Sequence, residues 1–239
     1  MQYLLINCYA EGMNQEEIKR NLGKAAAAQI KSGMVIGLGS GSTSECFIQS
    51  LIEKTKAGLQ VKAISSSKKS SQLAKAGGIE VIDINDAPRI DITVDGADEI
   101  DDKKRMIKGG GGCHVREKIV ATQSDKVLII VDESKIVEKI GTKPLPVELL
   151  FFGSPATKAI IEELGFDGTF RKAGDGSFFI TDNGNLILDI SFSAPPSNPE
   201  KIHQKLLDIP GVVDTGFFFN VANEVLVGYS DGKIEKINS

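Results

Sequence analysis

The sequence predicts an α/β protein in which a mostly parallel sheet carries helices on both faces, followed by a smaller α+β unit. Its 239 residues are enough to bury a core of this size. Up to residue 132, short and almost continuously apolar stretches alternate with segments whose apolar residues have helical spacing. Such strands are typical of parallel sheets covered on both faces. Beyond residue 143 the alternation gives way to turn-rich stretches, which predict the smaller unit.

The first elements are a helix, a strand and a second helix. Asn14 can cap a helix that runs to Ser32, and Glu17, three residues later, can complete a capping box. The apolar stretch 34–39 predicts a strand, which a cluster of glycine and serine interrupts. After that cluster, apolar residues resume helical spacing as far as Gly58.

The same alternation continues to the end of the predicted sheet. Further strands are expected at 61–65, 79–83, 90–95 and 127–132, with helices at 68–76 and 115–122. In such sheets ligands collect at the carboxyl ends of the strands. The two chemically unusual loops, 39–43 and 95–112, both follow strands and should therefore emerge at this edge.

A change of pattern marks the smaller unit. The two prolines of KPLPVE, residues 143–148, favour a rigid connection. Beyond it we expect helices at 154–164 and 199–207, a hairpin at 177–190 whose turn is Asn183–Gly184, and an extended run at 212–219. A last hairpin, 224–237, is expected to return to the first sheet. We therefore divide the chain into a domain of residues 13–145 and 221–239 and a small α+β domain of residues 146–220.

Composition and charge exclude several classes of protein. The formal net charge is −4 and the basic residues are dispersed, which argues against a nucleic-acid surface and against an anionic membrane. No stretch approaches the length of a membrane span, and the apolar start MQYLLINCYA has neither a basic region nor a cleavage signal. We expect a cytoplasmic protein with no nucleic-acid or membrane partner.

The cysteines and histidines are few and scattered. The three cysteines, Cys8, Cys46 and Cys113, are far apart, and the two histidines are His114 and His203. Neither a disulfide framework nor structural zinc fits this pattern. Cys113 adjoins a glycine run, where a nucleophile is conceivable, but a lone cysteine is more often a small buried apolar residue.

The segment GLGSGST, residues 37–43, is a candidate anion site. A glycine-rich turn between a strand and a helix offers free backbone N–H groups and the positive end of the helix dipole, which suit a phosphate. Ser40, Ser42 and Thr43 could add hydroxyl donors. The segment is neither a Walker A loop nor a complete GxGxxG motif. A tight turn with Ser42 or Thr43 as an ordinary helix cap is the alternative.

Four consecutive glycines, Gly109–Gly112, follow Lys108. Each glycine in ordered structure costs about 0.5–1 kcal/mol relative to alanine, so four together indicate close approach of the backbone to a ligand. Their N–H groups could act as oxyanion donors, and Lys108 adds a cation at the same place. A disordered surface loop is the alternative.

The acidic stretch DGADEIDD lies where a predicted strand ends. Asp95 and Asp98 flank this end and could face a cleft, whereas three further acids are expected to turn toward solvent: Glu99, Asp101 and Asp102. Oxygen ligands alone could hold Mg²⁺. A site for sugar hydroxyls ranks above a metal site, because the basic Lys108 follows so closely.

Six motifs occur in an order that resembles one known family. GSGST, DGADEID, KGGGG, REKI, DESK and KPLPVE are similar to segments of ribose 5-phosphate isomerase of the A type, and the similarity extends from Asn14 to the C-terminus through TDNGN and IPGVV. The resemblance implies a Rossmann-like fold and interconversion of D-ribose 5-phosphate and D-ribulose 5-phosphate through an enediol. It also implies a small-molecule sugar phosphate as partner, no metal or organic cofactor, and a homodimer or homotetramer.

The resemblance also assigns roles to individual residues. Taken alone, Glu117 would be a dipole partner in the first turn of a helix; by similarity it becomes the base that moves a proton between C2 and C1. Asp95 and Asp98 would handle ring opening and hydroxyl protons, and Lys108 with the glycine N–H groups would stabilise the enediolate oxygen. The implied substrate-binding residues are Lys19, Ser40, Gly41, Ser42, Thr43, Asp95, Gly96, Ala97, Asp98, Lys108, Gly109, Gly110, Gly111 and Lys135. Of these, Ser40–Thr43 would bind the phosphate, helped by Lys19 and Lys135.

The chain departs from the family pattern at two places. Residues 1–12 precede the point where the pattern starts and are expected to form an N-terminal extension, with Met13 a candidate initiator. Cys113 and His114 stand where small or apolar residues are expected. Two rival interpretations stay open. One is a non-catalytic sugar-phosphate sensor, for which no DNA-binding module is evident; the other is a related enzyme such as an amino-sugar phosphate deaminase, whose loops differ.

Overall fold

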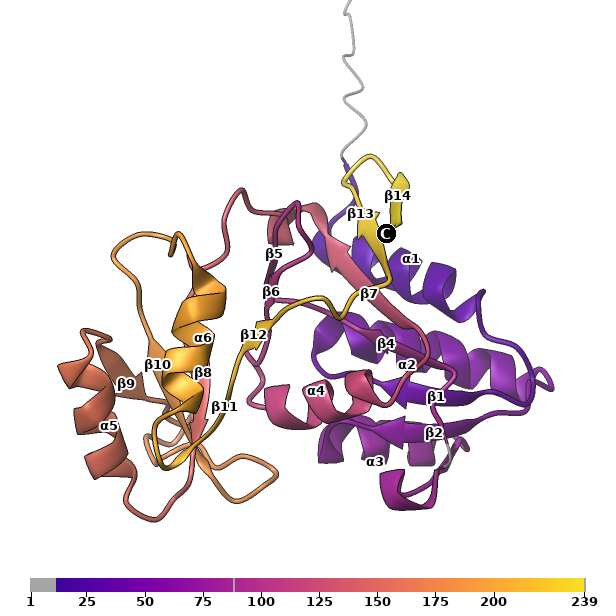
Figure 1. Ribbon diagram of the computed structural model, residues 1–239. Coiled ribbons are helices and arrows are strands. Elements are labelled where there is room, and N and C mark those ends of the chain that lie inside the picture. The colour runs from indigo at the N-terminus through magenta and orange to yellow at the C-terminus, as the bar shows by residue number, and fades with distance from the viewer. Residues whose placement is uncertain (1–11, 88, 239) are drawn as a thin grey trace, which may run out of the picture.

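The computed structural model describes residues 12–87 and 89–238, and Figure 1 shows how its elements are arranged. A seven-stranded sheet lies at the right of this view, a four-stranded sheet at the left, and a three-stranded sheet between them. The predicted N-terminal extension, apart from its last residue, lies outside the described residues and stays a prediction. The division of the chain into two domains stays one as well.

The seven-stranded sheet is parallel except at one edge. Its strand order is β14-β13-β7-β4-β1-β2-β3, and within it only β13 and β14 pair antiparallel. The strands are β1 (Val35–Leu38), β2 (Lys62–Ser65), β3 (Glu80–Val81), β4 (Ile92–Asp95), β7 (Val127–Asp132), β13 (Glu224–Gly228) and β14 (Ile234–Asn238). The predicted mostly parallel sheet is therefore confirmed, and β13 with β14 forms the predicted hairpin that returns to it.

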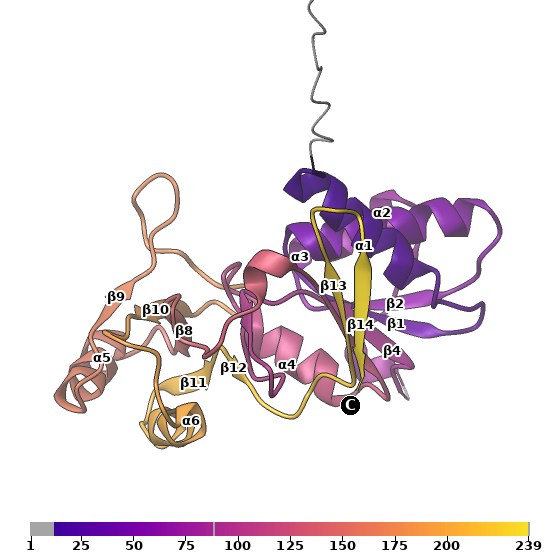
Figure 2. The same cartoon turned by 90° about the horizontal axis from the view of Figure 1, so that it is seen from above.

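Helices cover both faces of this sheet, as predicted. On one face lie α1 (Gln15–Ala27), α2 (Ser42–Lys56) and α3 (Lys68–Ala76), and on the other lies α4 (His114–Thr122), as Figure 2 shows. The apolar residues of β7 need both layers: Leu128 and Ile130 pack into the core under α1 and α2, whereas Val127, Ile129 and Val131 pack into a cluster on the opposite face. None of the helices in residues 12–87 and 89–238 is long and apolar enough to cross a membrane.

The start of α1 agrees with the sequence, and its end does not. The Asn14 side chain accepts a hydrogen bond from Glu17 N at 3.0 Å, and the Glu17 carboxylate accepts one from Asn14 N at 2.9 Å, which completes the capping box. The helix ends at Ala27, earlier than the predicted Ser32. At that point the Lys54 ammonium of α2 donates to the Ala27 carbonyl at 2.7 Å and satisfies an acceptor that the helix leaves free.

The smaller unit combines an antiparallel sheet with two helices. The strand order of the sheet is β11-β8-β10-β9. Its elements are β8 (Leu145–Leu149), α5 (Ser154–Glu163), β9 (Gly168–Phe170), β10 (Leu186–Ile190), α6 (Pro199–Leu207) and β11 (Val212–Thr215). Val147 and Leu188 of the sheet pack with Ile161 of α5 and Leu206 of α6 in one core. The predicted α+β character of this part is confirmed.

One prediction within this unit is wrong, and another holds only in part. KPLPVE is no connection, because its second half belongs to β8, an interior strand of the sheet. Pro146 lacks an N–H, but its carbonyl still accepts a hydrogen bond from Gly216 N at 2.7 Å. The hairpin predicted at 177–190 has its turn, with Gly184 at φ +83°, but its first arm forms only isolated bridges. β10 pairs instead with β8 and with β9, which is too short to show a periodic pattern.

The segment 95–112, predicted as one loop, contains a short hairpin. β5 (Glu99–Ile100) pairs with β6 (Met106–Ile107), and β12 (Phe217–Phe218) completes this three-stranded sheet. Two short 3₁₀ helices lie elsewhere near strand ends: η1 (Ile84–Asp86) and η2 (Glu133–Lys135). The hairpin separates the two halves of the predicted site along the chain, since Asp98 precedes it and Lys108 follows it.

The expectation that three acids of this segment face solvent holds for Asp102 alone. Glu99 is buried and accepts a hydrogen bond from Lys143 N at 2.7 Å. Asp101 is buried and pairs with the Arg105 guanidinium at 2.7 Å. Both carboxylates exchange water for hydrogen bonds within the protein, which is how charged groups become buried without a large penalty.

Candidate active site

Three neighbouring strands deliver the residues of one pocket. β7, β4 and β1 are adjacent and parallel, so the loops that follow them leave the sheet at the same edge. Together with the start of α1 and the segment between β6 and α4, these loops surround a pocket of about 130 Å³. Every predicted site residue except Asp95 lines this pocket, and Gln15 and Asp132, which were not predicted, line it as well.

Lys108 joins two buried carboxylates at the pocket. Its Nζ lies 2.9 Å from Asp95 Oδ2 and 3.2 Å from Glu117 Oε2, and it donates to the Gly96 carbonyl at 2.6 Å. The three charged side chains are each 5% exposed or less. Burial lowers the pKa of Lys108, but the charges of Asp95 and Glu117 outweigh burial and raise that pKa above its ordinary value. Lys108 therefore keeps its positive charge at the edge of the pocket.

Glu117, in the first turn of α4, has a pKa far above that of an ordinary glutamate. Burial is the main cause, and the negative charge of Asp95 adds to it, whereas the cation of Lys108 acts in the opposite direction. The net result is a rise of the Glu117 pKa from 4.5 to about 8. A carboxyl group that titrates near neutral pH can accept a proton from carbon and return it, as general acid–base catalysis requires.

Asp95 lies behind the pocket and connects two of its loops. Its Oδ1 accepts hydrogen bonds from Ser40 N and from Ser44 Oγ, both at 3.1 Å, while its Oδ2 faces Lys108. A Cβ on Gly39 would lie only 2.0 Å from Asp95 Oδ1, so this glycine is required for the close approach of the loop after β1. Asp95 thus fixes the position of Lys108 relative to that loop.

The glycine run is anchored, unlike the disordered loop that was the alternative. Asp98 Oδ2 accepts a hydrogen bond from Gly110 N at 2.7 Å. Gly109 has φ +97°, a conformation that favours glycine. A Cβ at this position would also lie only 2.7 Å from His114 Nδ1, so a side chain has no room here. Within the described part of the chain, the N–H groups of Gly109 and Gly111 have no hydrogen-bond acceptor. Both are therefore free to donate to a ligand.

The loop after β1 presents the start of a helix to the pocket. Gly41, with φ +87°, is the N-cap of α2, and no side chain caps the helix. The alternative in which Ser42 or Thr43 is the cap is therefore wrong. Both lie in the first turn, where backbone N–H groups have no partner within the helix. Lys19 and Lys135 line the same pocket, so this part of it suits an anion.

Asp132 is a pocket residue that the sequence analysis missed, although a signal was present. It ends an apolar strand at the same edge of the sheet as Asp95 does. Its Oδ1 accepts a hydrogen bond from Ser134 N at 3.0 Å, whereas its buried Oδ2 has no hydrogen-bond partner among the described residues. Gln15 offered no such signal, because it reaches the pocket from α1.

A larger hollow lies along the same edge beyond β2. Its volume is about 740 Å³, and Lys68, Asp83 and Arg116 contribute to its lining. The buried cluster of Asp95, Lys108 and Glu117 does not line it, so we place the chemistry in the smaller pocket. The described residues contain no group of three or more histidine, cysteine, aspartate or glutamate side chains that could hold a metal ion.

Comparison with known proteins identifies the family. The sequence model described as "Ribose 5-phosphate isomerase A (phosphoriboisomerase A)" matches residues 62–232. The ribose-5-phosphate isomerase A of Chlamydia caviae is 46% identical over 224 residues, which cover 93% of this chain and 96% of that protein. The solved ribose 5-phosphate isomerase of Plasmodium falciparum is 34% identical and has a TM-score of 0.90. That alignment covers 94% of this chain and 99% of the Plasmodium chain.

A second solved structure adds a ligand to the comparison. It is a D-ribose-5-phosphate isomerase in complex with phospho-erythronic acid. It is 36% identical and has a TM-score of 0.89, and the alignment covers 95% of this chain and 100% of that chain. The family model and the likeness to these relatives over nearly the full length agree. The chain belongs to the ribose 5-phosphate isomerase A family.

Proposed function

We propose that this chain interconverts D-ribose 5-phosphate and D-ribulose 5-phosphate through an enediolate. One observation carries the proposal: a buried carboxyl group with a pKa of about 8 lies 3.2 Å from a buried ammonium, in a pocket that also exposes free N–H groups. Phospho-erythronic acid, the ligand of a related isomerase, is a phosphorylated sugar acid, which matches a pocket with an anion site at one part and a cation at another.

Glu117 is the base in this mechanism. It takes the proton from C2 of the open-chain aldose, the electrons of that bond form the C1=C2 double bond, and O1 becomes negatively charged. A proton then passes from O2 to O1, the C2=O bond forms, and Glu117 returns its proton to C1. No atom is gained or lost, so the reaction needs no further reactant.

The negative oxygen of the intermediate needs donors that are already in place. The N–H groups of Gly109 and Gly111 supply them, and the positive charge of Lys108 stabilises the same oxygen; fixed donors in a site with little water are far more effective than donors in solution. Asp98 lines the pocket and Asp95 acts from behind it through Lys108. We therefore assign ring opening and the transfer of hydroxyl protons to Asp98, and we assign Asp95 an indirect part in these steps through Lys108.

The remaining lining residues bind the substrate. The first turn of α2 and residues Ser40–Thr43 hold the phosphate, and Lys19 and Lys135 balance its charge. Gly96 and Ala97 have little or no side chain and leave room for the sugar. These residues belong to the proposed catalytic domain, residues 13–145 and 221–239, and the proposed small domain, residues 146–220, supports it.

An assay with ribose 5-phosphate in excess EDTA tests the function. We expect ketose to form at the same rate with and without the chelator, because no step of the mechanism uses a metal. Absence of ketose would favour a sugar-phosphate sensor or a deaminase, and release of ammonia from an amino-sugar phosphate would identify the latter. Loss of activity on chelation would return the metal site to consideration.

The rate should depend on pH in a way that an ordinary glutamate would not produce. Glu117 must be ionised to take a proton, and burial together with the charge of Asp95 raises its pKa to about 8. We therefore expect kcat/KM to rise with pH and to level off above an apparent pKa near 8. Initial rates across the range from about pH 5 to pH 10 check this. A profile that stays flat down to about pH 5 would contradict it.

Cys113 should be dispensable for catalysis. Its Sγ donates to the Gly111 carbonyl at 3.5 Å, and burial, with the nearby charge of Glu117, raises the pKa of this thiol to about 11. The thiol therefore stays protonated at neutral pH. We expect Cys113→Ala to retain nearly all activity, and alkylation of Cys113 to slow the reaction by crowding the pocket. Cys46→Ala is the matched control, and an inactive Cys113→Ala would restore the nucleophile interpretation.

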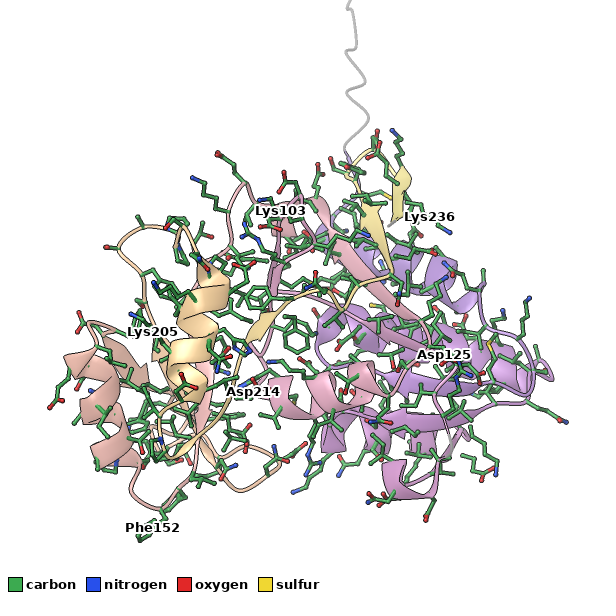
Figure 3. The ribbon with its side chains drawn as sticks, in the orientation of Figure 1. Lys103, Asp125, Phe152, Lys205, Asp214 and Lys236 are labelled. Atoms are coloured by element: carbon green, nitrogen blue, oxygen red, sulfur yellow. The ribbon has the colours of Figure 1, made fainter. Side chains whose placement is uncertain are left out.

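We further propose a cytoplasmic homodimer or homotetramer. Leu150, Phe151 and Phe152 leave an apolar patch after β8, and Phe152, which is 92% exposed, points away from the rest of the protein (Figure 3). Cys46 and Cys113 carry free thiols, which is usual in the reducing cytoplasm. Light scattering should give the mass of two or four chains. The mass of one chain at every concentration would contradict the assembly.

A further inference from the structure

Arg171 contacts the glycine run but does not line the pocket. It follows β9 in the four-stranded sheet and is far from the site motifs in sequence. We propose that Arg171 is a positioning residue, which orients the peptide groups of the glycine run so that Gly110 N–H holds Asp98 and Gly111 N–H faces the substrate. This inference rests on the proposed isomerase function and adds a residue to it.

The Arg171 guanidinium is fixed on both sides. Its Nη1 donates to the Gly109 carbonyl and to the Gly110 carbonyl, each at 2.9 Å. Its Nε and Nη2 donate to the two oxygens of Asp189 at 2.8 and 2.5 Å. Asp189 lies on β10, between two other strands, so the pair is attached to a rigid part of the sheet. The planar fork of an arginine can make all these bonds together, whereas the single ammonium of a lysine cannot.

The direction of these two carbonyls determines the direction of the next two N–H groups. A trans peptide carries its C=O and N–H on opposite sides, and no peptide bond in the described chain is cis. Because the Gly109 carbonyl points at Arg171, the N–H of Gly110 points away from it, and it donates to Asp98 Oδ2 at 2.7 Å. The Gly110 carbonyl also points at Arg171, so the N–H of Gly111 points away as well.

Gly111 is the residue for which this orientation has a chemical use. It lines the pocket, its N–H has no acceptor among the described residues, and a Cβ built on it would meet nothing within 4 Å. Its N–H is therefore available to the enediolate oxygen. The positive charge of Arg171 on the carbonyl side of the same peptide also polarises that N–H and makes it a better donor. Without Arg171, Gly112 N–H would still hold the Gly109 carbonyl at 2.9 Å, but the peptide between Gly110 and Gly111 could take many other orientations.

Three variants separate positioning from simple support of the fold. Arg171→Lys keeps the positive charge but cannot make the four hydrogen bonds of the guanidinium. Asp189→Asn weakens the pairing that holds the guanidinium but keeps Arg171. Lys172→Ala is the control. Lys172 is the next residue, and its ammonium lies over the Phe178 ring at 3.5 Å. Losing an oxyanion donor outright costs about 10²–10³-fold in kcat. For a misoriented donor we expect a fall of about 10-fold or more in Arg171→Lys, a smaller fall in Asp189→Asn, and none in Lys172→Ala.

The other readouts follow from where Arg171 acts. KM should change by less than about 3-fold, because the lost interaction forms mainly in the transition state. Inhibition by phospho-erythronic acid should weaken in Arg171→Lys, whereas inhibition by inorganic phosphate should not, since the phosphate site is on the loop after β1. Hydrogen exchange of the Gly110 amide, followed by NMR, should become faster in Arg171→Lys and stay unchanged in Lys172→Ala.

Each possible result decides the question. Wild-type kcat in Arg171→Lys, or an equal loss in Lys172→Ala, would overturn the inference. So would an equal weakening of both inhibitors, which indicates a general loss of structure. If Arg171→Lys does not fold, Asp189→Asn carries the same comparison. If the wild type forms no ketose, the proposed function fails, and the exchange of the Gly110 amide still decides whether Arg171 orients the glycine run.

Discussion

Replacing Glu117 by glutamine should lower kcat by about 10²–10⁴-fold, the range that general acid–base groups contribute. Glutamine has nearly the same shape but cannot accept a proton from carbon. Lys108 and the phosphate site remain, so substrate should still bind, and KM or calorimetry with ribose 5-phosphate measures that directly. The conversion of bound aldose to ketose is the only step that should fail.

The controls for this variant use a second glutamate and stability. Glu138→Gln, at an exposed position, should behave as wild type. The folded pKa of Glu117, about 8, lies above its ordinary value of 4.5, so between these values only the folded state holds the proton and wild-type stability falls as pH rises. Urea unfolding of Glu117→Gln should lack this fall. Wild-type-like kinetics in Glu117→Gln would remove this residue from the mechanism.

Replacing Lys108 by methionine should damage both activity and stability. The change removes the cation between Asp95 and Glu117 and leaves two buried carboxyl groups that only partly find other partners. Removing one partner of a buried ion pair costs about 3–5 kcal/mol, and we expect the free energy of unfolding in urea to fall by about that amount. Loss of an oxyanion partner should lower kcat by about 10²–10³-fold.

A double variant distinguishes these two effects. Lys108→Met with Glu117→Gln has one buried carboxyl group fewer, so it should recover part of the lost stability and none of the lost activity. Lys103→Met, at the exposed turn between β5 and β6 (Figure 3), is the control and should change neither quantity. Full stability in the single variant Lys108→Met would show that Lys108 does not neutralise the two carboxylates.

The sequence predicts the seven-stranded sheet well because its signals are local. The apolar stretch 127–132 coincides with β7, and the range 68–76 coincides with α3. Once the strands are known, their order determines where the loops lie, because loops that follow adjacent parallel strands leave the sheet at the same edge. Ser40–Thr43, Asp98 and Lys135 follow β1, β4 and β7 and therefore share a pocket, which Lys108 joins from the end of the β5–β6 hairpin.

The features that the sequence does not predict depend on distant partners. Nothing near Glu99 reveals that the backbone of Lys143 will bury it. Nothing near Arg171 reveals that it will hold the carbonyls of Gly109 and Gly110, because the contact joins two sheets. The prediction for Pro146 failed because a local signal was present but was overridden. A proline suggests a connection, whereas pairing with β10 makes this residue part of a strand.

The position of β13 has a consequence for synthesis on the ribosome. β13 pairs with Leu128–Asp132 of β7, yet its residues, Glu224–Gly228, follow the whole four-stranded sheet in the sequence. Until these residues have left the exit tunnel, one edge of β7 has no partner strand, although the loops of the site have already been synthesised. An unpaired strand edge can pair with other chains. The strands β13 and β14 therefore complete the seven-stranded sheet only after the four-stranded sheet has been synthesised, so a nascent chain cannot complete the larger sheet early.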